Sequence, residues 1–153
     1  MRKILAIVLL LAGFSGVAMG ADPVVGTWKL DVAKSKFSPG PAPTSARRVY
    51  TESVDGVTLE GKTVGADGKE TTLRVTYKGD GKSHPVASNP DADTITAKEV
   101  NARTWNFTLT KAGKVTYTVH RVVSADGKTL TVHNKGTHDG GAAFDDTLVF
   151  TRQ

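Results

Sequence analysis

Two arginines are the residues whose types and spacing most readily suggest chemistry. If residues 111–113 form a hairpin loop, Arg103 lies opposite Arg121, on the face that carries the apolar side chains. Adjacent like charges destabilise a sheet unless an anion, an acidic side chain or water relieves them. The aromatic residues expected on the same side of the sheet are Tyr77, Tyr117, Trp105 and Phe107.

Guanidinium groups beside a phenol, inside an apolar enclosure, suit a carboxylate or phosphate head group, and the apolar walls suit the rest of the molecule. The arginine pair therefore predicts a binding site for a small hydrophobic or amphiphilic molecule, including an anionic one. The alternative interpretation is that both arginines lie at a strand end and reach water, while their stems cover the core.

The histidines are the second set that could do chemistry. A two-residue turn at 126–127 places His120 opposite His133 on the outer face, and His138 follows with Asp139 beside it. Imidazole and carboxylate groups bind divalent metals, but the tight spacing of a metal-binding motif is absent. We therefore predict no metal site.

The chain lacks the usual signatures of covalent catalysis. It has no cysteine and no Gly-x-Ser-x-Gly segment, and its acidic residues fall mainly in turns or on polar faces. Asp145 and Asp146 precede the last apolar segment, where we expect them to serve the loop and solubility. We predict a protein that is not an enzyme and that uses no cofactor.

The elements that must position these residues are strands. Apolar side chains alternate with polar ones, and no helical period is sustained after the first twenty residues. The alternating segments are 24–32, 57–59, 73–77, 95–97, 105–109, 115–123, 130–132 and 148–150. One apolar face and one polar, solvent-exposed face are typical of an antiparallel sheet.

Tight turns separate these segments. Glycine accepts a positive φ, and aspartate hydrogen-bonds to its own turn backbone, so such pairs indicate hairpins. The turn pairs are Asp55-Gly56, Asp67-Gly68, Asp80-Gly81, Ala112-Gly113 and Asp126-Gly127. We predict an all-β antiparallel meander of about eight to ten strands that closes into a small barrel, which removes exposed edge strands.

Two segments show no strand period. Residues 38–44 contain three prolines, and residues 84–90 begin and end near a proline. Proline fixes φ and removes a backbone donor, so both segments are expected to be loops. They either lie over the mouth of the barrel or are plain surface connections.

The N-terminal residues have the composition of a signal peptide. Arg2 and Lys3 precede an apolar run at 4–12, and Ala18 and Gly20 supply small residues for cleavage before residue 21. The run is too short for a good membrane span. We predict that residues 1–20 are removed and that residues 21–153 form one domain, periplasmic or secreted, without a cysteine for lipid attachment.

Charge argues against nucleic acid as a partner. Arg2 and Lys3 leave with the signal peptide, which lowers the formal net charge of +5 by two. The remaining basic residues are scattered among acidic ones, without the interleaved aromatic stripe of a nucleic-acid-binding surface.

The two ends of the predicted domain carry a resemblance. Gly26-Thr27-Trp28-Lys29-Leu30 opens it, and Phe150-Thr151-Arg152 closes it. This pattern resembles the calycin superfamily, the lipocalins and fatty-acid-binding proteins, and in particular the lipocalin-like proteins that bacteria export. The resemblance implies a barrel whose narrow end is plugged by Trp28, with Gly26 beside it and the Arg152 side chain lying across the indole.

The resemblance also implies a small-molecule carrier, although the chain departs from both branches. It has no cysteine for the lipocalin disulfide, and a proline-rich segment stands where fatty-acid-binding proteins have a helical lid. Two classes of function remain open. The first is an exported binding protein with an internal cavity, and the second is a structural or interaction module whose barrel is filled by its own aromatic side chains.

Overall fold

The computed structural model describes residues 20–153. The predicted signal peptide, residues 1–20, lies outside the described residues apart from Gly20. Within the described part, no helix is long and apolar enough to cross a membrane.

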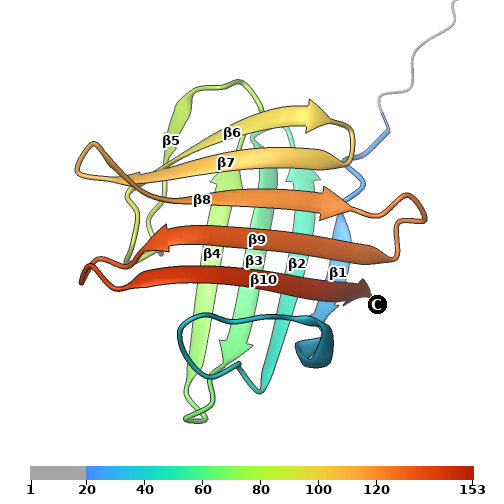
Figure 1. Cartoon of the computed structure of the whole chain (residues 1–153). Helices are drawn as coiled ribbons and strands as arrows, with labels where there is room; N and C mark the ends of the chain where they lie inside the picture. The colour runs from blue at the N-terminus through green and yellow to red at the C-terminus, as the bar shows by residue number, and fades with distance from the viewer. Residues whose placement is uncertain (1–19) are drawn as a thin grey trace, which may run out of the picture.

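The described chain forms one ten-stranded sheet, and every neighbouring pair of strands is antiparallel (Figure 1). A single 3-10 turn, η1 (Val32–Lys34), follows the first strand. The strands are β1 (Gly26–Leu30), β2 (Ser45–Ser53), β3 (Gly56–Val64), β4 (Glu70–Tyr77), β5 (Ser83–Pro85), β6 (Thr94–Asn101), β7 (Thr104–Lys111), β8 (Lys114–Val123), β9 (Thr129–Thr137) and β10 (Ala143–Arg152).

The sheet is a meander that curls until its two halves face each other. Its order is β4-β3-β2-β1-β10-β9-β8-β7-β6-β5, so the first strand pairs with the last. In Figure 1, β1 to β4 cross behind β6 to β10. The predicted all-β antiparallel barrel is confirmed, and the strand number falls in the expected range.

The seam of the barrel lies between β4 and the segment that follows β5. Here the Ser88 side chain takes the place of a neighbouring strand, because its hydroxyl accepts from the Arg74 backbone N–H (2.9 Å) and donates to the Arg74 carbonyl (2.7 Å). One side chain thus bridges an edge that carries no ladder, and the barrel is nearly closed.

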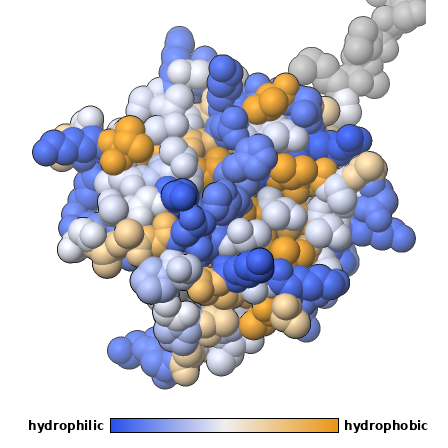
Figure 2. All heavy atoms as spheres, viewed as in Figure 1, coloured by the Kyte–Doolittle hydropathy of each residue, from blue (hydrophilic) through white to orange (hydrophobic). Residues whose placement is uncertain are grey.

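Alternation along the strands separates an apolar interior from a polar exterior. The inward side chains form one continuous core, whereas polar side chains cover most of the face seen in Figure 2 and interrupt its apolar patches. Predicted inward residues that are buried include Leu59, Val75, Tyr77, Ile95, Trp105, Phe107, Leu109, Leu130 and Phe150.

The β7–β8 hairpin differs from the prediction. Its loop has two residues, Ala112 and Gly113, both with positive φ, and a register shift follows at Leu109 and Thr110. Trp105 therefore pairs with Arg121, not with Val119 as predicted. Turns with two positive φ values match the twist of the flanking strands, which explains why the tighter loop wins.

Because of this register, two side chains of β8 lie in positions other than the predicted ones. Val115, expected on the inner face, is 61% exposed, and Tyr117 takes the inward position opposite Leu109. Arg103 precedes β7 in the turn and is exposed, so the predicted Arg103–Arg121 pair does not form. The β8–β9 register, by contrast, is confirmed, with Arg121 opposite Val132 and His120 opposite His133.

The closed end of the barrel is built around Trp28. This side chain is 0% exposed, and its indole N–H donates to the Val24 carbonyl at 2.7 Å. The Arg152 guanidinium lies 4.2 Å from the ring centroid and donates to the carbonyls of Gly127, Val25 and Pro23. The Arg152 guanidinium therefore covers the indole and also hydrogen-bonds to three loop carbonyls.

Gly26 leaves room for this arrangement, and its replacement is expected to be costly. A Cβ at Gly26 would lie 2.6 Å from Arg152 Nη1, and the backbone has φ +133°. We expect Gly26→Ala to lower the free energy of unfolding by about 1–3 kcal/mol, measured by urea denaturation. Gly40→Ala is the matched control, since Gly40 has φ +123° and open space around it. Equal losses in the two variants would contradict a steric role for Arg152.

Candidate functional site

Arg121 lies inside the closed half of the barrel, where both of its terminal nitrogens have partners and its buried Nε has none within residues 20–153. The residue is 2% exposed, and its Nη2 is 3.1 Å from Asp22 Oδ2. Its Nη1 donates to the Tyr77 hydroxyl. Burial raises the pKa of the Tyr77 phenol, which therefore stays protonated and neutral beside the guanidinium.

Four aromatic rings surround the same guanidinium. Its central carbon lies between 5.4 and 5.7 Å from each ring centroid. The rings belong to Tyr50, Tyr77, Trp105 and Phe107. Tyr77 packs edge-on against Phe107 at 4.8 Å between centroids, and Trp105 stacks on Phe107 at 6.2 Å. Since a carboxylate balances the charge and aromatic faces enclose it, Arg121 serves the packing of the closed end.

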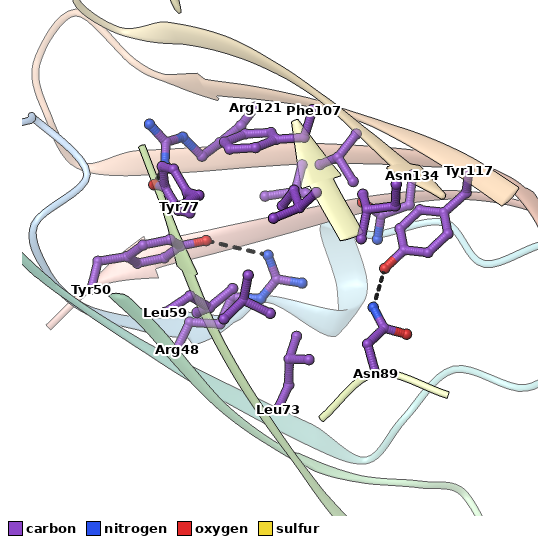
Figure 3. A pocket seen from close by; sticks show the side chains of 15 residues that line it. Arg48, Tyr50, Leu59, Leu73, Tyr77, Asn89, Phe107, Tyr117, Arg121 and Asn134 are labelled. Carbon is purple, nitrogen blue, oxygen red and sulfur yellow. Dashed lines mark hydrogen bonds between the residues drawn. The ribbon is translucent and has the colours of Figure 1, made fainter. Parts of the chain in front are cut away.

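Beside this cluster, and lined in part by it, the barrel holds a cavity of about 110 Å³. Figure 3 shows that its lining side chains come from both halves of the barrel and from the segment after β5. Most of the lining is aliphatic or aromatic. The lining residues are Arg48, Tyr50, Leu59, Leu73, Val75, Tyr77, Asn89, Ile95, Phe107, Leu109, Tyr117, Val119, Arg121, Val132 and Asn134.

Arg48 is the cation of this cavity that has no acidic partner within residues 20–153. It is half-buried on β2, and its Nη1 lies 3.4 Å from the Tyr50 hydroxyl (Figure 3). Its guanidinium carbon is 4.7 Å from the centroid of the Phe150 ring. Strand alternation places residue 48 on the same face as Tyr50, and this was the available signal that sequence reasoning missed.

Polar groups gather at the end of the cavity away from Trp28. Asn89 Nδ2 donates to the Tyr117 hydroxyl at 2.6 Å (Figure 3), and burial raises the pKa of that phenol. The Asn134 Oδ1 atom is buried without a hydrogen-bond partner in the described chain. An unsatisfied buried oxygen costs about 1–3 kcal/mol, so a donor placed next to it is favoured.

The structure brings together most, but not all, of the residues predicted to contact a ligand. Tyr77, Tyr117, Phe107 and Arg121 line the cavity. Trp105 packs on Arg121 behind it and does not line it. Arg103 is not brought to the cavity, because it lies in the turn between β6 and β7 and its side chain is exposed.

The histidines on the outer face use their ring nitrogens in hydrogen bonds to neighbours. His120 Nδ1 is 2.7 Å from Asn106 Oδ1, and His133 Nε2 is 2.7 Å from Asp145 Oδ1. Within residues 20–153, no group of three or more histidine or acidic side chains is arranged to hold a metal ion.

No family model matches the chain, and no curated protein matches it. Solved structures are similar to it, and three of them are described here. As-p18, an extracellular fatty acid binding protein, is 14% identical with a TM-score of 0.49, covering 86% of this chain and 97% of that one. Zebrafish ileal bile acid-binding protein, complexed with cholic acid, is 8% identical with a TM-score of 0.48, covering 86% and 99%.

The siderocalin Ex-FABP is 10% identical with a TM-score of 0.39, covering 86% of this chain and 74% of that one. The resemblance to calycins predicted an antiparallel meander that closes into a small barrel, and a nearly closed barrel of ten strands is observed.

Proposed function

We propose that this protein binds a compact amphiphilic anion inside its barrel, with the anionic group on Arg48 and the apolar part against the aliphatic and aromatic walls. The observation that carries the proposal is the half-buried Arg48 guanidinium, which borders an apolar cavity and has no acidic partner within residues 20–153. A carboxylate bound at such a cation is stabilised, because charge-assisted hydrogen bonds are about twice as strong as neutral ones.

The size of the cavity restricts the ligand. About 110 Å³ is less than the roughly 300 Å³ at which pockets for drug-sized ligands begin, and it is close to the roughly 150 Å³ of a cavity that accepts benzene. A long-chain fatty acid exceeds this space unless side chains move. The ligand class that fits is a short aliphatic or small aromatic carboxylate, and a hydroxyl or N–H on it would supply the donor that Asn134 Oδ1 lacks.

Binding without catalysis is part of the proposal. The cavity lining contains no histidine, aspartate or glutamate that could transfer a proton to or from a bound molecule. The competing idea of a barrel filled by its own side chains is less favoured, since the aromatic side chains around Arg121 leave a cavity that three of them line. We also propose export, on the composition of residues 1–20.

Replacing Arg48 tests this proposal. We expect Arg48→Met to raise the Kd for hexanoate about 10- to 100-fold, because a charged hydrogen bond contributes about 1.5–3 kcal/mol. Isothermal titration calorimetry measures the effect. Hexanol, which lacks the charge, should bind the parent and the variant alike.

Arg47→Met is the matched control, because Arg47 is the exposed neighbour that points to the outer face. It removes one positive charge from the same strand and should leave the Kd for hexanoate unchanged. If Arg47→Met and Arg48→Met weaken hexanoate binding equally, or if hexanoate does not bind the parent, the proposal is wrong.

A further inference from the structure

One segment borders the cavity and runs between two buried anchors. Val86 and Ala92 are buried in the core, and the Val86 N–H donates to the Asp93 carbonyl at 2.8 Å. Residues 87–91, which we call the strap, run between these anchors and are exposed or half-buried. In the strap, Asn89 faces the cavity and donates to the Tyr117 hydroxyl (Figure 3).

The strap is fastened to the β9–β10 hairpin by Asp91. One carboxylate oxygen lies 2.8 Å from His138 Nδ1, and the other accepts the Asp139 backbone N–H at 2.8 Å. Burial raises the pKa of Asp91, but the hydrogen bonds from His138 and Asp139, with the nearby charge of Lys111, hold it below its usual value. The carboxylate is therefore ionised near neutral pH and accepts both bonds.

A lysine from β7 reinforces the same fastening. Lys111 Nζ donates to the Pro90 carbonyl in the strap and to Asp139 Oδ2 in the hairpin, both at 2.6 Å. The His138 ring also packs on Phe144 of β10 at 4.5 Å between centroids. On the other side, Ser88 holds the strap to β4 at the seam of the barrel.

We expect the strap to open locally at a low cost in free energy. Its attachments are polar and near the surface, and its buried apolar anchors lie outside the segment that would move. Segments with few buried apolar contacts and exposed hydrogen bonds open at a small fraction of the free energy of global unfolding. Opening would withdraw Asn89 from Tyr117 and uncover the cavity.

We propose that the strap is the gate through which a ligand reaches the cavity, and that the Asp91–His138 contact is the latch that holds it shut. The role of the gate depends on the proposed function, because a gate needs a ligand to admit. Its opening, however, is a property of the ligand-free protein. It therefore admits a test that needs no ligand.

A buried thiol provides that test, because the chain has no cysteine of its own. Val132→Cys places a thiol in the cavity wall, and its labelling rate by a small maleimide reports how often the gate opens. In this background, Asp91→Asn and His138→Gln should each raise the labelling rate about tenfold or more. Val119→Cys, also in the wall, serves as a second reporter if the first variant does not fold.

His133→Gln is the matched control. It breaks a similar histidine–aspartate contact, to Asp145, on the outer face away from the mouth. Labelling rates equal to that of the parent in the two latch variants, or equally raised in His133→Gln, would overturn the gate. Failure of hexanoate to bind, with labelling accelerated as expected, would refute the proposed function and leave the gate standing.

Discussion

Trp28→Ala is expected to lower the free energy of unfolding by about 3–5 kcal/mol, the usual range for truncating a buried aromatic side chain. The indole fills the closed end, is inaccessible to solvent, and donates to the Val24 carbonyl. Its loss also leaves the Arg152 guanidinium without the ring on which it lies. Guanidinium chloride denaturation followed by circular dichroism measures the change.

Trp28→Phe is a milder change at the same position, because it removes the hydrogen bond but only part of the ring volume. It keeps a ring under Arg152 and loses the indole N–H, so its destabilisation should be smaller than that of the alanine variant. A Trp28→Ala protein that unfolds at the denaturant concentration of the parent would show that the closed end does not depend on this side chain.

Asp22→Ala is the second change with a large expected effect. It leaves the Arg121 guanidinium buried among aromatic rings without its carboxylate, and breaking a buried ion pair from one side costs about 3–5 kcal/mol. The lost bond from the Val24 N–H to Asp22 Oδ1 adds to this. Urea denaturation measures the free energy of unfolding.

A double variant isolates the contribution of the unpaired charge. Adding Arg121→Met to Asp22→Ala removes the buried cation and should recover a large part of the lost stability, since an apolar side chain of similar length suits the aromatic surroundings. A double variant no more stable than Asp22→Ala alone would contradict the view that Arg121 is a structural cation balanced by Asp22.

Local pattern was enough to predict the barrel. Alternation marked the inward faces, and the turn at Asp126-Gly127 set the β8–β9 register that turns Arg121 inward. The pairing of Trp28 with Arg152 agrees with the arrangement that the calycin resemblance implied. These features depend on neighbours in sequence or on the two ends of the chain, which a sequence displays directly.

The details of the site depended on contacts that sequence does not display. Arg103 lies in the turn before β7 and is exposed, and the shorter β7–β8 loop, with the register shift at Leu109 and Thr110, pairs Arg121 with Trp105. The partner of Arg121 is Asp22, which is 99 residues away along the chain, so no local pattern joins them. The same holds for Asn89 and Tyr117, which meet only once the strap crosses the mouth.

The proposal for Arg48 rests on elimination of the more obvious arginine. Arg121 has the aromatic surroundings and the phenol that the sequence suggested for a head group, but Asp22 already occupies its guanidinium. Arg48 has no such partner in the described part of the chain, residues 20–153, and it lines the cavity. The two arginines therefore have different roles in this account: Arg121 stabilises the closed end, and Arg48 binds the anionic group of the ligand.

A crystal structure of the protein with hexanoate tests this separation most directly. We predict electron density for the ligand in the cavity, with its carboxylate at the Arg48 guanidinium and its alkyl chain against Phe107 and Val119, while the Asp22–Arg121 contact stays intact. A carboxylate that displaces Asp22 from Arg121, or a barrel interior that holds no hexanoate at a saturating concentration, would contradict the account.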